Sequence, residues 1–387
     1  EQQYNTDIYC RMYRSVDELL AYAHQTSPKV YRPFIMTEYL HTMGNSGGGL
    51  KEYMEVFESE PVVQGGCIWD WVDQSFREVD AHGKWYWAYG GDYGPENIPS
   101  FGNFCCNGLV NAVREPHPHL KEVKKAYQYI KCTLKDPKNL TIAIKNWYDF
   151  TNLNAYVLKW SIMGDNGKML AKGEQSIEVA PHATTEVSLG GVRLPRNIRE
   201  AYLNLSWTPK KKSAFIGTDD EVAYDQFVLP ANSQYRPTLA KLSEKPEIQI
   251  DPKTGALTSY IYEGQEYLAS PVRLSLYRPA TDNDNREKKG GAKVWRKLGL
   301  NHLVQRVLSV KTSGHTTYSE VKLLNDKNET IGSATFEYTI RKDGILSVQT
   351  RFVPDTTFVS SLARVGLVFE MPHSFNLSLI HISEPTR

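Results

Sequence analysis

The sequence predicts a multi-domain protein in which an α/β region, built on a parallel sheet or a (β/α) barrel, precedes two all-β regions. Three observations predict this order. Apolar runs alternate with amphipathic helical segments over residues 1–130, as in parallel strands joined by helices. From residue 131 onward the pattern becomes the period-two alternation of half-buried strands. A polar, proline-containing segment at residues 230–244 separates two such β regions.

The α/β region at residues 1–130 should contain three strands and three helices. The expected strands are apolar runs at residues 8–10, 33–36 and 66–69, and the second of these is continuous enough for burial on both faces. The first helix follows Ser15 and Glu18, whose spacing forms a capping box. The second helix is predicted by four apolar residues spaced along one helical face, namely Leu50, Tyr53, Met54 and Phe57. Pro118 is suited to the first turn of the third helix.

The all-β regions are expected at residues 131–237 and 238–376. Alternating strands and Gly/Asn-rich turns predict a β-sandwich in the first, with strands at residues 140–145, 156–163, 201–207 and 223–229. The second should hold strands at residues 247–251, 257–262, 272–277, 334–341, 346–352 and 365–370. Residues 251–255, with the sequence Asp-Pro-Lys-Thr-Gly, should turn the chain between the first two of these.

Charge and cysteine content exclude several classes of protein. The 45 Lys and Arg against 44 Asp and Glu give a formal net charge of +1 with no basic run, so we expect neither nucleic acid nor an anionic membrane surface as a partner. No apolar stretch is long enough to span a bilayer. The cysteines are odd in number and fit neither a disulfide framework nor a zinc site, so we expect buried free thiols at Cys10, Cys67, Cys105, Cys106 and Cys132.

Glu38 is the first candidate for chemistry. It comes just after the apolar run at residues 33–36, where the buried strand should end. In a (β/α) barrel the catalytic side chains lie at that end of the strands. A carboxylate at a strand end can also serve only as the partner of an arginine or lysine, or face solvent. Position alone leaves these readings open.

The residues around Glu38 favour glycoside hydrolysis. His41, Asn45 and Ser46 add an imidazole, an amide and a hydroxyl, and residues 69–74 bring two tryptophans and two aspartates to the next strand end. A carboxylate that attacks an anomeric carbon beside aromatic rings that hold the sugar is the arrangement this reaction uses. Trp69 by itself is equally typical of a buried core.

Four segments in this order resemble those of the large β-galactosidases of glycoside hydrolase family 2: residues 32–46, 64–74, 88–94 and 104–110. The resemblance continues more weakly through both β regions and covers residues 1–376. It implies the C-terminal strands of a (β/α)8 TIM barrel at residues 1–130. It further implies an immunoglobulin-like β-sandwich at residues 131–237 and the N-terminal part of a β super-sandwich at residues 238–376.

The resemblance also implies roles for individual residues. Glu38 corresponds to the nucleophile that forms a covalent galactosyl-enzyme and so hydrolyses terminal β-galactosides with retention. Tyr13 corresponds to a tyrosine that donates a hydrogen bond to the nucleophile. His41, Trp69 and Asn107 correspond to residues that bind galactose. The substrate would be lactose or a galactosylated glycan.

Metal ions and a second carboxyl are implied as well. Phe104, through its carbonyl, and Asn107, through its side chain, correspond to ligands of an active-site sodium ion. The Mg²⁺ ligands and the acid/base glutamate correspond to residues upstream of this chain. Because a retaining mechanism needs both carboxyls, we expect this chain to be inactive alone. The family resemblance further implies a homo-oligomer.

Two features depart from the family pattern. Arg11 stands where the family usually has proline. Residues 377–387 read like the translation of a sequencing-adapter end, which predicts a non-native tail. Two alternatives also remain. One is another family 2 glycosidase acting on β-glucuronides or β-mannosides. The segment His41–Ser46, which follows Glu38, argues against this alternative. The other is a non-catalytic carbohydrate-binding or vestigial barrel protein.

Overall fold

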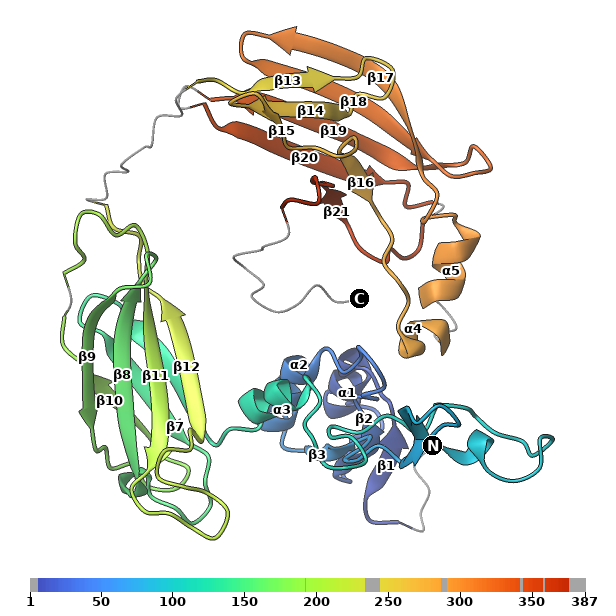
Figure 1. Ribbon diagram of the computed structural model, residues 1–387. Coiled ribbons are helices and arrows are strands. Elements are labelled where there is room, and N and C mark those ends of the chain that lie inside the picture. The colour runs from blue at the N-terminus through green and yellow to red at the C-terminus, as the bar shows by residue number, and fades with distance from the viewer. Residues whose placement is uncertain are drawn as a thin grey trace. The chain divides into compact units, whose positions relative to one another are not determined.

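The computed structural model describes residues 6–191, 193–233, 244–286, 291–341, 344–357 and 359–375. The chain divides into two compact units, Glu1–Thr238 and Leu239–Arg387, which are treated separately below (Figure 1). The tail expected at residues 377–387 and much of the segment at 230–244 lie outside the described residues. Across the described ranges, no helix has the length and apolar character needed to cross a membrane.

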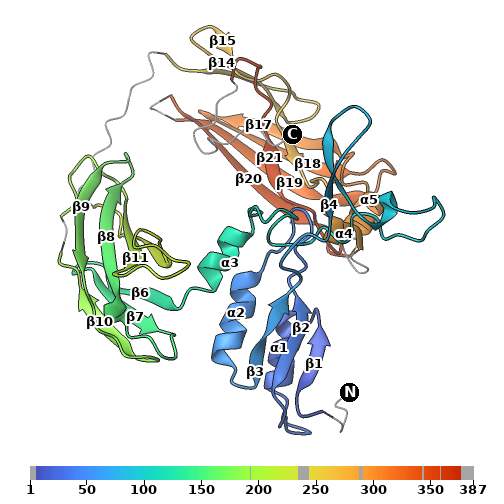
Figure 2. The same ribbon diagram turned by 60° about the horizontal axis from the view of Figure 1, so that its bottom comes forward.

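A parallel three-stranded sheet opens the first unit. The strands are β1 (Tyr9–Met12), β2 (Phe34–Tyr39) and β3 (Val63–Ile68), in the order β1-β2-β3. The helices are α1 (Val16–Ala23), α2 (Leu50–Ser59) and α3 (Leu120–Ala126), and Figure 2 shows α1 and α2 beside the strands. Phe34, Met36 and Leu19 are almost fully buried in the core that the sheet and helices share. These strands and helices form the parallel α/β arrangement that the sequence predicts.

Local sequence signals account for where these helices begin. The Ser15 hydroxyl accepts a hydrogen bond from Glu18 N at 3.2 Å, and the Glu18 carboxylate accepts one from Ser15 N at 2.9 Å, which confirms the capping box. The prediction for Pro118 is wrong, because α3 begins at Leu120. Leu120 N and Lys121 N bond carbonyls three residues back, so a tighter turn precedes the α-helix.

The segment between β3 and α3 contains elements that the sequence analysis did not predict. A hairpin of β4 (Phe76–Val79) and β5 (Trp85–Ala88) leads into the short helix η1 (Gly90–Asp92). Phe76 and Trp85 are at least half exposed, so this hairpin lacks the buried face by which a strand is usually recognised.

The rest of the first unit is a β-sandwich of two antiparallel sheets. One has the order β10-β7-β6, with β6 (Ile130–Asp136), β7 (Thr141–Asn146) and β10 (Thr184–Ser188). The other has the order β12-β11-β8-β9, with β8 (Tyr156–Gly164), β9 (Met169–Gln175), β11 (Ala201–Pro209) and β12 (Ala223–Val228), and η2 (Leu153–Ala155) precedes it. Inward-facing residues such as Ile144, Leu158 and Trp207 are fully buried between the sheets. Three strands against four is the immunoglobulin-like arrangement.

The second unit is also built on sheets around a core of its own. Its longest sheet has the order β17-β18-β19-β20, with β17 (Val304–Ser313), β18 (Thr316–Leu324), β19 (Thr330–Ile340) and β20 (Leu346–Pro354). The smaller sheets join β13 (Glu247–Ile250), β14 (Leu257–Tyr262) and β15 (Gln265–Glu266), and pair β16 (Arg273–Ser275) with β21 (Gly366–Val368). Two short helices, α4 (Asp282–Arg286) and α5 (Gly291–Lys297), were not predicted. The turn at residues 251–255 is confirmed, since Gly255 N bonds Asp251 O at 2.7 Å.

All five cysteines are free, as predicted, but the expectation that all are buried is wrong. Cys10 on β1 and Cys67 on β3 are exposed. Cys10 follows Tyr9, and Cys67 precedes Ile68. Both Tyr9 and Ile68 pack into the core with the helices. Side chains alternate along a strand, so these two thiols lie on the face away from the helices.

Candidate active site

The sheet brings the predicted residues to one edge. Tyr13 follows β1, Glu38 is the second-last residue of β2, and Trp69 follows β3. Tyr13 N donates to Glu38 O, and Trp69 N donates to Tyr39 O, both at 2.9 Å. Because the strands are parallel, all three positions lie at the carboxyl ends, where barrel enzymes hold their catalytic groups.

A β-bulge in β2 sets the direction of Glu38. The register shows one extra residue in β2 against both neighbours, with the pairs Arg11–Met36, Met12–Glu38, Met36–Gly66 and Tyr39–Ile68. Phe34 and Met36 point into the helical core, and simple alternation would place Glu38 there too. Tyr39, fully buried, takes that place instead. The bulge therefore turns the half-buried Glu38 to the other face.

Tyr13 lies beside the Glu38 carboxylate, where its phenol is placed to donate a hydrogen bond to that carboxylate. The pKa of Tyr13 is well above its ordinary value, first because the phenol is partly desolvated, then because of this hydrogen bond and the charges of Glu38 and Asp70. Tyr13 therefore stays protonated and remains a donor. Its backbone has a left-handed φ of 51°, just past the end of β1. This conformation is uncommon for a residue with a side chain and is frequent near functional sites.

His41 stands two residues past the end of β2 and contacts two other candidates. Its ring stacks on the Phe104 ring with centroids 4.8 Å apart and meets the Tyr13 ring edge to face at 6.0 Å. Its Nε2 lies 3.3 Å from an atom of the Asn107 side-chain amide. His41 thus joins the end of β2 to the segment at residues 104–107, which is distant in the sequence.

Asn107 is 2% exposed and lies beside the Phe104 carbonyl oxygen. With the amide reversed, its oxygen accepts a hydrogen bond from Trp69 Nε1 at 3.0 Å, and its nitrogen donates to Cys105 O at 3.3 Å. We adopt this orientation because it satisfies both amide atoms. The amide oxygen then stands 3.3 Å from the Phe104 carbonyl oxygen, so two acceptors face each other.

The sequence analysis missed Thr42, and it placed Asp70 at this strand end without giving it a role of its own. Thr42 is 1% exposed, and its hydroxyl bonds the carbonyls of Trp69 and Asn107, which fastens these two segments together. Asp70 raises the pKa of Tyr13, and burial raises the pKa of Asp70 itself. The proximity of Asp70 to the aromatic Trp69 and Trp71 was visible in the sequence. Thr42 gave no signal, because a lone threonine after a strand is common in loops.

The arrangement suits chemistry on a sugar. It places a phenol beside a carboxylate, and adds an imidazole, an amide and an indole from neighbouring segments. The described residues contain no group of three or more His, Cys, Asp or Glu side chains placed to hold a metal ion. The facing oxygens of Asn107 and Phe104 fit a hard monovalent or divalent cation better than a transition metal.

Comparison with protein families divides the chain as the fold does. Residues 2–132 match the TIM barrel domain of glycosyl hydrolases family 2. Residues 142–230 match domain 4 of β-galactosidase, and residues 243–377 match the β-galactosidase small chain.

Curated relatives carry corresponding names. The β-galactosidase of Priestia megaterium is 35% identical over 389 residues, which is 96% of this chain and 37% of that protein. β-Galactosidase 2 of Enterobacter cloacae is 32% identical over 352 residues, 83% of this chain and 34% of that protein. The chain thus spans little more than a third of the length of these relatives. A solved β-glucuronidase of Bacteroides uniformis aligns with a TM-score of 0.24 at 13% identity, over 95% of this chain and 44% of that one, too low a similarity to argue from.

Proposed function

Because this chain belongs to the β-galactosidases of glycoside hydrolase family 2, we propose that it carries the nucleophile half of a retaining β-galactosidase site. Glu38 is the nucleophile. It attacks the anomeric carbon of a terminal β-galactoside, the glycosidic bond breaks, and a covalent galactosyl ester forms that water then hydrolyses. The observation that carries the proposal is the bulge in β2, which aims Glu38 at the face where Tyr13 donates to it.

The surrounding residues have distinct parts in this proposal. Tyr13 holds the Glu38 carboxylate in position and stabilises its ionised form through the hydrogen bond. His41 and Asn107 bond galactose hydroxyls, and the Trp69 ring lies under the apolar face of the sugar. Hydrogen bonds that tighten as positive charge develops on the ring lower the barrier to reaction.

We propose that the Asn107 amide oxygen and the Phe104 carbonyl oxygen are ligands of a sodium ion. The Asn107 amide and the Phe104 carbonyl lie 3.3 Å apart, and with the amide reversed both present oxygen atoms, the donor type that such an ion takes. A bound sodium ion would supply a fixed positive charge for substrate hydroxyls. Mg²⁺, as a second ion, would take ligands from outside this chain.

The second carboxyl of the mechanism is proposed to come from outside this chain as well, in keeping with the share of the relatives' length that it covers. Retaining enzymes place the two carboxyls roughly 5–5.5 Å apart. The chain alone should therefore turn over no galactoside. The complete gene product would act on lactose or a galactosylated glycan, and we propose that it is a homo-oligomer, which light scattering would test.

The experiment is covalent trapping on the complete gene product. A dinitrophenyl 2-deoxy-2-fluorogalactoside has a leaving group that departs without acid assistance, so the adduct reports the nucleophile alone. We expect mass spectrometry to find one galactosyl adduct, on the peptide that contains Glu38. Glu38→Gln should abolish the adduct and the hydrolysis of a nitrophenyl galactoside. Glu55→Gln, on the exposed face of α2, is the matched control and should change neither.

Other outcomes would replace the proposal. An adduct on a different residue would remove Glu38 from the nucleophile role. Faster hydrolysis of a nitrophenyl glucuronide or mannoside than of the galactoside would assign another substrate. Galactose binding without an adduct or turnover would favour a carbohydrate-binding protein. Nitrophenyl galactoside hydrolysis by the 387-residue chain alone, lost in Glu38→Gln, would contradict its expected inactivity.

A further inference from the structure

A short hydrogen-bonded ladder continues beyond β3 and carries two of the site residues. It joins residues 70–73 to residues 107–110. The bonds are Asp70 N to Asn107 O at 2.9 Å, Leu109 N to Asp70 O at 2.9 Å, Val110 N to Trp71 O at 3.1 Å, and Asp73 N to Val110 O at 3.0 Å. Trp69 immediately precedes one side of this ladder and Asn107 begins the other, so the ladder holds their backbones near each other.

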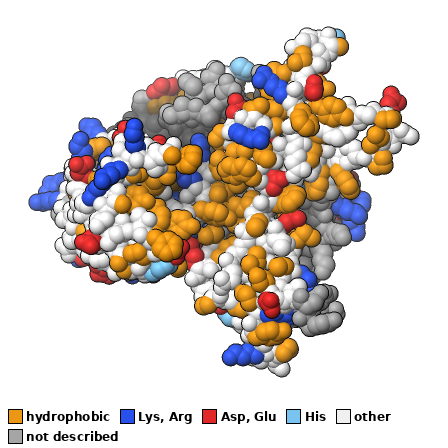
Figure 3. All heavy atoms as spheres, turned by 90° about the horizontal axis from the view of Figure 1, so that it is seen from below, with side chains coloured by type: hydrophobic (Ala, Val, Ile, Leu, Met, Phe, Trp, Pro, Cys, Tyr) orange, Lys and Arg blue, Asp and Glu red, His pale blue; other side chains and the backbone are white. Residues whose placement is uncertain are grey.

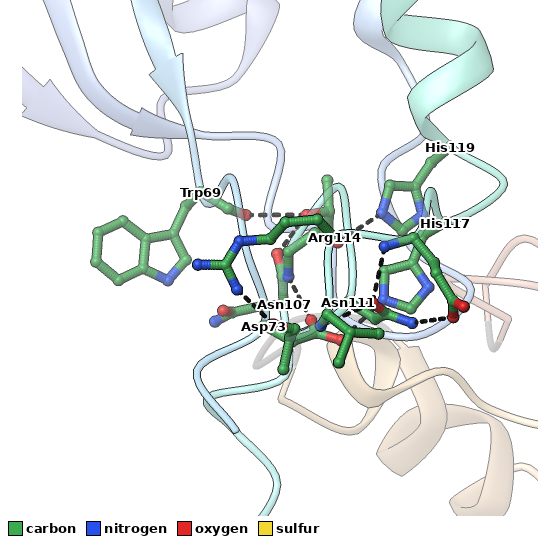
Figure 4. A network of polar contacts seen from close by, with 12 residues as sticks. Trp69, Asp73, Asn107, Asn111, Arg114, His117 and His119 are labelled. Atoms are coloured by element: carbon green, nitrogen blue, oxygen red, sulfur yellow. Dashed lines mark hydrogen bonds and ion pairs between the residues drawn. The ribbon is translucent and has the colours of Figure 1, made fainter. Parts of the chain in front are cut away.

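Gly108, next to Asn107, is held at both of its backbone polar groups. Its N–H donates to Asp73 Oδ1 at 2.7 Å, and its carbonyl accepts from His119 Nε2 at 2.9 Å. The other oxygen of Asp73 accepts from His117 Nε2 at 2.8 Å. Figure 4 shows Trp69 and Asn107 on one side of this network and the two histidines on the other.

The protonation of the network follows from its acceptors. A carboxylate and a backbone carbonyl can only accept, so both histidines carry a hydrogen on Nε2. The Asp73 side chain is 11% exposed, which strengthens its bonds to Gly108 and His117 relative to bonds in water. The two imidazole rings stack with centroids 5.6 Å apart, so each limits the movement of the other.

Only glycine fits at position 108. A Cβ atom there would lie 2.3 Å from Asp73 N, 2.4 Å from the Val72 carbonyl carbon and 2.5 Å from Val110 O. Such approaches do not occur, so the backbone of Gly108 meets the opposite side of the ladder at the limit of contact. A close approach of this kind needs polar groups that hold it in place, and Asp73 and His119 supply them.

We propose that Asp73, His117 and His119 are positioning residues of the galactoside site. They hold Gly108 and so fix Asn107 against the Trp69 indole. None of the three belongs to the residues that are expected to touch the sugar. The inference rests on the proposed function, since it assigns these residues to the binding of galactose by Asn107 and Trp69.

The test compares Asp73→Ala with Asp73→Asn in the complete gene product. Alanine removes both hydrogen bonds. Asparagine keeps an oxygen for Gly108 N–H, and its amide can donate to His117 once the imidazole takes its other tautomer. We expect Asp73→Ala to raise the KM for a nitrophenyl galactoside by about tenfold or more, the range found for partners that orient site ligands, with a smaller change in kcat. Asp73→Asn should recover most of the loss.

Hydrogen exchange provides the second readout. In Asp73→Ala the peptide that contains Gly108 should exchange faster, whereas Asp73→Asn should keep the wild-type rate. Asp17→Ala, which removes an exposed aspartate of α1, is the control and should change neither measurement. If Asp73→Ala does not fold, His119→Ala against His119→Gln tests the same contact, because glutamine can still donate to the Gly108 carbonyl.

Two results would overturn the inference. Faster exchange at Gly108 with an unchanged KM would leave the three residues a purely structural role. Unchanged exchange and an unchanged KM would show that the three residues do not hold Gly108 in place. Failure of the proposed function is separate, because it appears as the absence of a Glu38 adduct in the otherwise unmodified protein.

Discussion

At the scale of single residues, the site depends on a donor that keeps its proton. Tyr13 is 44% exposed, yet its phenol lies beside the Glu38 carboxylate and interacts electrostatically with Asp70. Partial desolvation, followed by the hydrogen bond and charge of Glu38 and the charge of Asp70, raises the pKa of Tyr13, so a phenolate forms only at a pH above the usual range for tyrosine. A hydrogen bond to a charged group is worth more than one between neutral groups, which makes Tyr13 a strong contributor to the placement of Glu38.

We expect Tyr13→Phe to slow formation of the Glu38 adduct by roughly ten- to a hundredfold, because loss of a hydrogen bond to a charged group costs about 1.5–3 kcal/mol. Because the pKa of Tyr13 is raised above its ordinary value of about 10, the ratio of wild-type to variant rates should stay constant from about pH 6 to about pH 11. Adduct formation followed by mass spectrometry measures both. Tyr31→Phe, at a position 74% exposed, is the control. A ratio that falls toward one as the pH rises through about 10 would show that Tyr13 ionises normally.

At the scale of elements, two local devices set the position of the site. The capping box begins at Ser15, three residues after Met12 at the end of β1, and so fixes how the chain leaves the strand. The bulge in β2 then orients Glu38. The capping box is formed by residues within a four-residue segment, so it can be recognised in the sequence. The bulge depends on the pairing of β2 with the strands on both sides.

Ser15→Ala should destabilise α1 by about 1 kcal/mol, because an N-cap side chain satisfies a backbone donor that otherwise has no partner in the helix. Amide exchange in α1, measured under native conditions on the complete gene product, reports this as a lower free energy of opening. Ser15→Asp retains a capping oxygen and should preserve most of the protection. Equal protection in the alanine and aspartate variants would mean that the cap contributes nothing.

At the scale of the whole molecule, each unit is built around its own core. Trp207 and its neighbours fill the β-sandwich of the first unit, and Phe336 and Tyr338 lie in the core of the second. The barrel strands differ, because apolar side chains such as Met12 remain more than half exposed beside the site. Figure 3 shows many apolar side chains on one face of the molecule. Three strands cannot close a barrel, which in its complete form has eight.

Trp207→Ala should lower the stability of the β-sandwich by roughly 3–5 kcal/mol, the usual cost of deleting a fully buried tryptophan. We expect faster amide exchange in β8 and β11 and an unchanged rate in β18 and β19, since these pairs belong to different cores. Phe215→Ala removes an aromatic residue that is 97% exposed and should alter neither pair. A loss of protection in both units would show that they unfold as one.

The sequence by itself determined the order of the α/β and all-β regions, because periodicity and capping are local properties of the chain. It also predicts, through the resemblance of the motifs around Glu38, Trp69 and Asn107, which residues carry the chemistry. It did not predict the β4–β5 hairpin, whose strands are exposed and lack an alternating pattern.

Only the tertiary structure decided how those residues meet. The direction of Glu38 depends on an extra residue that appears only when β2 is paired with both neighbours. The role of Asp73 depends on Gly108, 35 residues away, and on histidines that follow later still. Such contacts form when folding brings segments that are distant in the sequence together, so no local sequence pattern predicts them. The residue types therefore follow from the sequence, whereas their directions and partners follow from the packing of the strands.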